Sequence, residues 1–237
     1  KNSMKKILSL FAALVVVFSS FADPAVVTKK FKVANFNSIE LGSAFEVHVH
    51  KGNVYAVSVT GREKDIDELE VSSSSGKLEI GYESGWKWTW NNNRSKLVVN
   101  ITLPRLNSGD FSGASKVDLQ GFTNEEEMSL VFSGASKGLI EGLHADKLKI
   151  ELSGASDCKI TGHTDYLKVE ASGASHLKAL DFFARNVDVD ASGASSAQVH
   201  VQKSLKVDAS GASHVKYKGS PVISKDLSGA ASLHQVN

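Results

Sequence analysis

Apolar and polar residues alternate along most of the chain with the two-residue period of a β-strand. In one representative stretch, Leu148, Ile150 and Leu152 alternate with Lys149 and Glu151 and lead directly into the tetrapeptide Ser-Gly-Ala-Ser. The alternation resumes after the tetrapeptide, and a glycine often closes the second stretch. Period-two alternation predicts strands with one buried face. Each unit is therefore predicted to be a strand, a tight corner, a second strand, a glycine turn and a short return.

The Ser-Gly-Ala-Ser corner recurs at intervals of 18 to 21 residues through the second half of the chain. Six copies are complete, and a seventh, from Ser228, is interpreted as carrying one extra alanine. Such fixed-period similarity is the mark of a repeat architecture. The residues that open the seven predicted corners are Ser112, Gly113, Ser133, Gly134, Ser153, Gly154, Ser172, Gly173, Ser192, Gly193, Ser210, Gly211, Ser228 and Gly229.

A unit of about 20 residues with two short strands cannot close a hydrophobic core alone, but it can when it stacks on similar units at the ~4.8 Å strand spacing. Leucine-rich repeats share the period, yet their consensus is missing from this sequence. Crossovers between parallel strands are overwhelmingly right-handed. The sequence therefore predicts an all-β fold, a right-handed parallel β-helix (β-solenoid) with ~20-residue rungs.

The corner composition has a physical reason in such a stack. Glycine tolerates a positive φ that other residues resist. We expect the corner alanine, such as Ala174, to fill the narrow inside of the bend. The two serines are expected to form hydroxyl ladders that bond corner backbone groups or one another.

The first residues are predicted to direct export. Lys5 and Lys6 precede an apolar run from Ile7 to Phe18, and small residues allow cleavage after Ala22. About 12 apolar residues are too few for a membrane span, which needs ~20. We therefore predict a signal peptide at residues 1–22 and no transmembrane span in the mature chain.

The part that precedes the regular repeat is less uniform. Residues 41–49 align with residues 209–217 as a degenerate rung, and other alternating stretches indicate strands. We interpret residues 23–106 as degenerate, hairpin-bearing rungs and a cap, with a separate domain as the alternative. Residues 107–237 are predicted to form the seven-rung solenoid, and under the favoured interpretation residues 23–237 are one continuous domain.

Several motifs also resemble one known family. They are Asn35-Phe36-x-x-Ile39, Phe45-x-Val47-x-Val49 and Ile101-Thr102-Leu103-Pro104-x-Leu106, followed by the Ser-Gly-Ala-Ser corners. Across Phe31 to Asn237 the chain resembles the putative auto-transporter adhesin head GIN domain family of Bacteroides-like bacteria. The resemblance implies a right-handed β-helix, export beyond the inner membrane and an adhesin role, and it supplies no catalytic residues.

Charge and cysteine content narrow the function classes. Without the three lysines of the leader, 24 basic residues stand against 26 acidic ones. This balance offers no electrostatic footprint for nucleic acid. Cys158 is the single cysteine, which excludes an intrachain disulfide framework, and its inward position predicts a small core residue.

A carboxylate precedes most corners by two residues. The ladder consists of Asp110, Glu151, Glu170, Asp190, Asp208 and Asp226. We favour a solvated face that the lysines Lys149, Lys168 and Lys206 partly neutralise. The alternative is a calcium ladder at Glu151, Glu170, Asp190 and Asp208, because calcium accepts several carboxylate oxygens.

Three tryptophans stand out from the repeat. Trp86, Trp88 and Trp90 alternate in an amide-rich segment, so one face of a strand would carry all three rings. They are candidates for binding a glycan or a protein partner. The alternative, which we favour, is that they cover the N-terminal edge as part of the cap.

The sequence offers no convincing catalytic, cofactor or metal site. Residues 134–138 match the G-x-S-x-G pattern, but Ser136 is one of several equivalent corner serines and no helix is predicted after it. The pairs His48–His50 and His176–His214 have no third metal ligand near them. We therefore predict no enzyme and no cofactor.

The last rung suggests a monomer. Lys225 and His234 are predicted at inward positions, and inward charge blocks edge-to-edge pairing.

The leading hypothesis is an exported interaction module in the periplasm, on the outer-membrane surface or outside the cell. It would bind a glycan or an envelope or host protein in the manner of an adhesin. A polysaccharide-cleaving β-helix enzyme and a purely structural envelope protein are the alternatives, because fold alone does not decide function.

Overall fold

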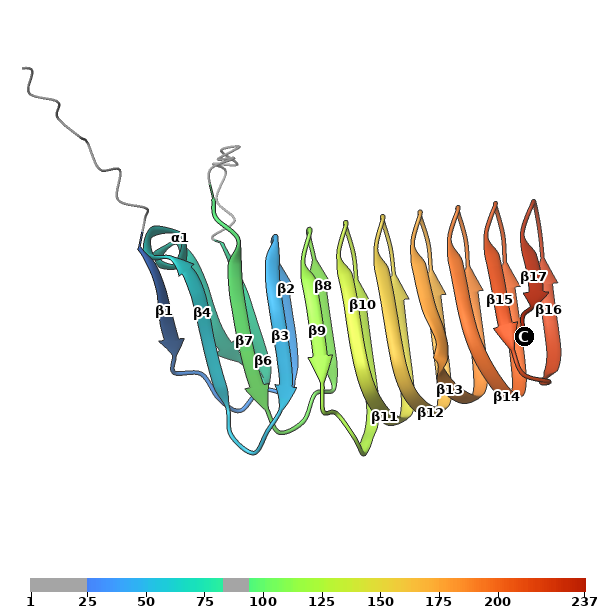
Figure 1. Cartoon of the computed structure of the whole chain (residues 1–237), viewed down its shortest axis with the longest axis horizontal. Coiled ribbons are helices and arrows are strands. Elements are labelled where there is room, and N and C mark those ends of the chain that lie inside the picture. The colour runs from blue at the N-terminus through green and yellow to red at the C-terminus, as the bar shows by residue number, and fades with distance from the viewer. Residues whose placement is uncertain (1–24, 83–93) are drawn as a thin grey trace, which may run out of the picture.

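The structure is a computed structural model that describes residues 25–82 and 94–237. The strands in these residues join into one 17-stranded hydrogen-bonded sheet, which coils into the elongated β-solenoid of Figure 1. Successive rungs pair in parallel, as Leu148 does with Leu167 and Ile150 with Val169. The predicted all-β parallel solenoid is confirmed, and its right-handed sense stays a prediction.

The regular part consists of seven rungs, each with one strand before its corner and one after it. Four long strands run from one corner, through the turn, to the next corner. The strands are β8 (Ser108–Ser112), β9 (Lys116–Gln120), β10 (Glu125–Phe132), β11 (Lys137–Leu152), β12 (Asp157–Ala171), β13 (His176–Ala191), β14 (Ser196–Ala209), β15 (His214–Lys218), β16 (Val222–Leu227) and β17 (Ser232–Gln235).

Inward side chains of successive rungs stack into continuous apolar columns, which is how units that cannot close a core alone share one. Cys158 lies in this core as predicted, and burial raises the pKa of its thiol to about 12. One column, buried throughout, consists of Leu130, Ile150, Val169, Val189 and Val207.

The corner glycines have the backbone that the repeat predicts. Their φ angles lie between 69° and 79° at all seven corners. A Cβ atom added to Gly173 would also lie 2.5 Å from the carbonyl oxygen of Gly154 in the preceding rung. A side chain is thus excluded twice, once by the local backbone and once by the stack.

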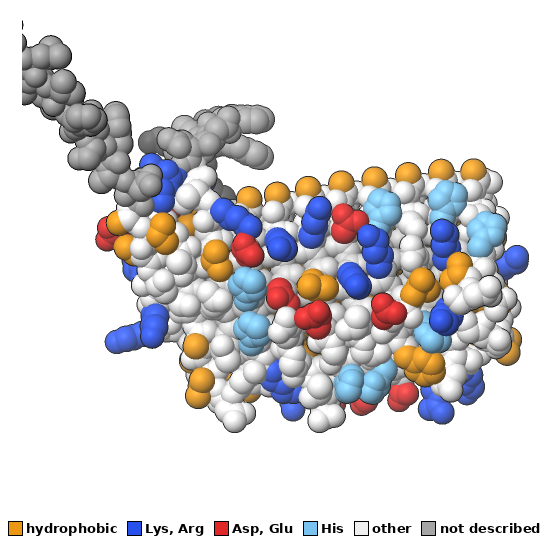
Figure 2. Space-filling model, in the orientation of Figure 1, with side chains coloured by type: hydrophobic (Ala, Val, Ile, Leu, Met, Phe, Trp, Pro, Cys, Tyr) orange, Lys and Arg blue, Asp and Glu red, His pale blue; other side chains and the backbone are white. Residues whose placement is uncertain are grey.

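The corner alanine lies on the opposite side from the one predicted, whereas the second serine bonds corner backbone groups as predicted. The alanines, such as Ala174, are exposed, and they form the row of orange side chains along the upper edge in Figure 2. The second serine is buried instead, and Ser156 Oγ lies 3.1 Å from the Phe132 carbonyl oxygen and 3.0 Å from that of Ser153. The placement of alanine inside the bend is therefore wrong. Carbonyl groups at the inside of the corner favour a side chain that donates a hydrogen bond, which alanine cannot do.

The seventh corner contains no inserted residue. Ser232 pairs with His214, which stands directly after the inward serine of the sixth corner. Ala230 and Ala231 therefore occupy the places of the corner alanine and the inward serine. The prediction of one extra alanine is wrong. The pairing of the last two rungs shows that Ala231 replaces the inward serine and that no residue is inserted.

This register also changes the account of the last rung. His234 pairs with Lys216, whose side chain points outward, so the prediction of an inward His234 is wrong. Lys225 does stand in register with the buried Val207, and it is exposed because it belongs to the terminal rung. The monomer stays a prediction.

The N-terminal rungs do not stack in chain order. β2 (Ser38–Gly42) and β3 (Phe45–Lys51) pair on one side with β8 and β9. On the other side they pair with β6 (Lys77–Tyr82) and β7 (Leu97–Leu103). The rung of β2 and β3 therefore lies between the rung of β6 and β7, which comes later in the sequence, and the rung of β8 and β9.

Antiparallel strands cover this outer rung. β4 (Ala56–Arg62) pairs with β7, β1 (Val26–Phe31) pairs with β4, and β5 (Leu69–Ser74) pairs with β6, all antiparallel. The short helix α1 (Glu63–Asp67) joins β4 to β5 at the left of Figure 1. The reversal of strand direction ends the parallel stack and protects its edge.

Candidate functional site

The carboxylate ladder forms one column on the side of the solenoid that precedes the corners. Glu151, Glu170, Asp190 and Asp208 pair in register on successive rungs and line a groove of about 370 Å³ with the first serines of their corners. Val131 interrupts the column. Beyond these rungs the column continues through Glu79, Glu40 and Asp110 at one end and Asp226 at the other.

Lysines of the neighbouring column neutralise much of this charge. Lys149 Nζ lies 2.5 Å from a carboxylate oxygen of Glu151 and 3.1 Å from one of Glu170. Lys168 Nζ lies 2.8 Å from Glu170 and 3.8 Å from Asp190. The hydrogen bond from Lys168, and then that from Lys149, hold the pKa of Glu170 below its ordinary value. These pairs are those expected of a solvated and partly neutralised face.

Calcium would need several of these oxygens at once. In residues 25–82 and 94–237, no three His, Cys, Asp or Glu side chains are grouped so that they could hold a metal ion. The lysine ammonium groups instead lie between successive carboxylates. The described residues thus favour the ion-paired face over the calcium ladder.

The side that follows the corners carries a second set of lysines, and Figure 2 views the molecule on this side. Lys159 and Lys178 stand in register on adjacent rungs, and Gln198 and Lys216 continue the same column. We call these four residues the free-lysine column, since none of its lysines has a hydrogen bond or ion pair with another described residue. Sequence reasoning missed the column, although its lysines all stand three residues after an inward serine.

A short third side lies between the two long ones, next to the glycine turns. His144, His163, Phe183 and His200 follow one another in register there with their side chains outward. The rings of His144 and His163 stack with centroids 3.8 Å apart, and Phe183 meets His200 edge-on at 5.0 Å. Sequence reasoning missed this aromatic column, because the turns vary in length and the residues that pair across rungs cannot be aligned from the sequence.

The stacked rings of His144 and His163 lead us to expect that the free energy of unfolding decreases in acid. Burial, and then the neighbouring His163, lower the pKa of His144 below 6.5. The unfolded chain therefore binds a proton more readily, so stability should fall as pH decreases through about 6.5. The contribution should stay below about 1 kcal/mol because the rings lie near the surface. Glu125, Asp146 and Asp165 line the same small pocket and carry the opposing charges.

Thermal denaturation between pH 7.5 and 5 tests this prediction. The variant His144→Gln should lose less stability over that range than the wild type does. His214→Gln is the matched control, because His214 lies on another side of the solenoid and stands next to a serine, Ser232, rather than another histidine. An identical pH dependence in His144→Gln and the wild type would contradict the prediction.

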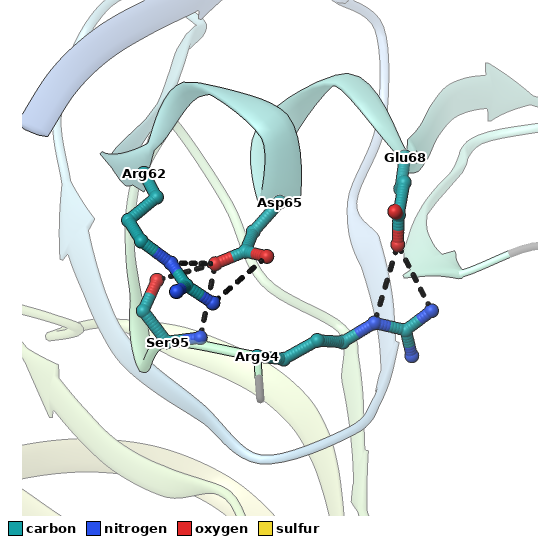
Figure 3. A network of polar contacts seen from close by, with 5 residues as sticks. All are labelled: Arg62, Asp65, Glu68, Arg94 and Ser95. Carbon is teal, nitrogen blue, oxygen red and sulfur yellow. Dashed lines mark hydrogen bonds and ion pairs between the residues drawn. The ribbon is translucent and has the colours of Figure 1, made fainter. Parts of the chain in front are cut away.

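A polar clamp joins α1 to the start of β7 (Figure 3). The buried Asp65 accepts hydrogen bonds from Arg62 Nε at 2.7 Å, from the Ser95 backbone N–H at 2.9 Å and from Ser95 Oγ at 2.6 Å. Burial by itself raises the pKa of Asp65, but the hydrogen bonds from Arg62 and Ser95 outweigh it and lower the pKa to about 2. Beside it Arg94 binds Glu68 and lies 3.9 Å over the ring of Tyr82.

The remaining sequence candidates do not converge on a reactive centre. Ser136 of the G-x-S-x-G pattern is fully buried and lies 2.9 Å from the Ser133 carbonyl oxygen, to which its hydroxyl donates. His48 lies 3.7 Å from both Glu46 and Asp118, and its ring is parallel to that of His50. Trp86, Trp88 and Trp90 lie outside the described residues, and so does the predicted leader. Their roles stay predictions.

The fold and its regular outward columns define the chain as a parallel β-solenoid with extended side surfaces. The chain belongs to the family described as putative auto-transporter adhesin, head GIN domain, whose model matches residues 35–221. The resemblance drawn from the sequence motifs is thereby confirmed. No curated protein matches the chain significantly.

Solved structures share this fold at low sequence identity. A putative adhesin from Bacteroides fragilis is 22% identical, with a TM-score of 0.83 over 90% of this chain and 98% of its own. A putative adhesin from Parabacteroides distasonis is 17% identical, with a TM-score of 0.72 over 90% and 98%. A putative lipid binding protein from the same organism is 22% identical, with a TM-score of 0.67 over 90% and 97%.

Helices contribute little to the described residues. None of the helices in residues 25–82 and 94–237 is both long and apolar enough to cross a membrane.

Proposed function

We propose that this chain is an adhesin-type interaction module of the cell envelope, which binds a glycan or protein partner through its long outer sides without catalysis. The observation that carries the proposal is the register of the outward side chains. Because the rungs stack in parallel, chemically similar groups repeat along a rigid axis on each side. A surface of this kind suits an extended partner better than a small molecule.

Two features support surface binding over catalysis or storage of a ligand. The serine in the nucleophile-like pattern is buried and donates to a backbone carbonyl, whereas a nucleophile must be accessible beside a base. Buried apolar side chains also form one continuous core cluster in the described chain. A lipid, the type of ligand named for the putative lipid binding protein of Parabacteroides distasonis, would therefore have to bind on the outside of this chain.

Family membership supports the cellular setting. An adhesin role requires export, and the predicted signal peptide at residues 1–22 would provide it. We infer that the mature protein acts in the periplasm, on the outer-membrane surface or outside the cell.

A glycan array with the purified mature chain, residues 23–237, tests this function. We expect saturable binding to a subset of extended glycans, retained in Ser136→Ala because that serine only supports a corner. The same array incubated for hours should show no loss of polysaccharide. Degradation by the wild type that disappears in Ser136→Ala would establish an enzyme instead.

A further inference from the structure

The lysines on the two long sides of the solenoid differ in their electrostatic environment. Before the corners, Lys149 and Lys168 pair with carboxylates of the same side, and Lys206 lies 3.7 Å from Asp188. After the corners, the lysines of the free-lysine column have no such partner among the described residues. These three lysines before the corners thus have acidic partners on their own side, whereas the lysines of the free-lysine column are available to an external partner.

The spacing within the free-lysine column is fixed by the fold. Lys159 and Lys178 are one rung apart, and Lys178 and Lys216 are two rungs apart. The strand spacing places these charges ~5 Å and ~10 Å apart along the axis. Like charges directly opposite one another on paired strands repel. A partner that carries negative charges at the same spacing would remove this repulsion at each rung.

Acidic residues on the same side are occupied elsewhere. Asp157 lies 3.5 Å from a ring nitrogen of His176, and Asp118 accepts a hydrogen bond from Gln120 at 3.0 Å. Neither forms an ion pair with a lysine of the column among the described residues. The column therefore faces outward as a line of positive charge.

Building on the proposed function, we propose that the free-lysine column binds a linear acidic polysaccharide laid along the solenoid axis. An extended chain of pyranose rings advances by about one ring per rung, so carboxylate or sulfate groups on successive or alternate rings can meet Lys159, Lys178 and Lys216. The amide of Gln198 can donate to a ring hydroxyl between them. Ionic contacts of this exposed kind give binding that salt weakens.

A lipid surface fits this column less well. Membrane-binding faces combine basic residues with apolar side chains that enter the bilayer. Leu139, which pairs with Lys159 at one end of the column, is 36% exposed, and the four residues of the column itself include no apolar side chain. One apolar side chain at the end of a polar column is too little to enter a bilayer.

The test compares two variants of equal charge change. Lys159→Gln/Lys178→Gln removes two free lysines, and Lys149→Gln/Lys168→Gln removes two paired lysines from the other side. Titrations of the mature chain with heparin, polygalacturonate and neutral dextran give dissociation constants at low and physiological salt. We expect binding of at least one acidic polymer, about tenfold weaker in the first variant, as two exposed ionic contacts would give. The second variant should change less than about twofold.

The outcomes separate this inference from the proposed function. Equal losses in both variants would show a response to net charge alone and overturn the assignment of the column. Binding only to neutral glycans would overturn it as well and leave the interaction module intact. Phosphatidylglycerol vesicles serve as a further probe. If the wild type binds these vesicles but no acidic polymer, and Lys159→Gln/Lys178→Gln loses the vesicle binding, the column would be assigned to a membrane instead. Failure to bind any glycan or envelope protein would reject the proposed function itself.

Discussion

Replacing Gly173 with alanine should destabilise the solenoid by ~3–5 kcal/mol, which is large for the addition of one methyl group. The backbone of Gly173 has a φ of 71°, and the new Cβ would lie 2.5 Å from the Gly154 carbonyl oxygen and 3.1 Å from its nitrogen. Both neighbours are backbone atoms held by the adjacent rung, so they cannot move away alone. Urea denaturation followed by circular dichroism should show a clearly lower midpoint.

Gly142 provides the matched control for this substitution. It also has a positive φ, 64°, but an added Cβ would meet nothing within 4 Å. Gly142→Ala should therefore cost only the backbone term, ~1–2 kcal/mol. The difference between the two variants measures the contribution of stacking at the corner. Equal costs would mean that backbone conformation alone explains the corner glycines.

Replacing Asp65 with alanine should destabilise the N-terminal cap by ~3–5 kcal/mol. The substitution leaves the Arg62 guanidinium and the Ser95 backbone N–H without the carboxylate that now accepts from both. Amide hydrogen exchange should become faster in β4, α1 and β7 and stay unchanged in β12 to β14, where the stack is independent of the cap. Uniform acceleration along the solenoid would contradict a local role.

An exposed ion pair nearby gives the contrast. Glu68, whose side chain is 50% exposed, binds Arg94 at 3.0 Å. Glu68→Gln should lower the free energy of unfolding by less than about 1 kcal/mol, because exposed ion pairs contribute little.

The pH dependence of stability adds a second check on the role of Asp65. Its pKa of about 2 lies below the ordinary 3.8, so its stabilising effect is present above pH 3.8 and is lost as pH falls toward 2.

Some features of this protein could be predicted because the repeat imposes them on every rung. The two-residue alternation determined which side chains of β11 to β14 enter the core. The corner glycine followed from the need for a positive φ, and the position of the carboxylate ladder followed from its constant offset to the corner. Each of these is a local or periodic property, which a single sequence contains in many copies.

The content of the corner could not be predicted in the same way. Alanine and serine are both small, and the sequence does not show which of them points inward. The choice depends on carbonyl groups at the inside of the bend, such as those of Phe132 and Ser153. For the same reason the last corner was misinterpreted, because only the pairing of Ser232 with His214 shows that Ala231 replaces the inward serine.

The sequence by itself determined the strand pattern, the period and hence the parallel stack, since these follow from alternation and from the bulk that each corner excludes. The tertiary structure alone decided the order of the N-terminal rungs, with β6 and β7 outside β2 and β3. It also showed that Lys149 and Lys168, which the sequence placed beside the carboxylates of their own strands, each reach a carboxylate of the next rung as well. Contacts between rungs join residues that are ~20 or more positions apart in the sequence. A local sequence pattern therefore does not show which side chains of neighbouring rungs meet.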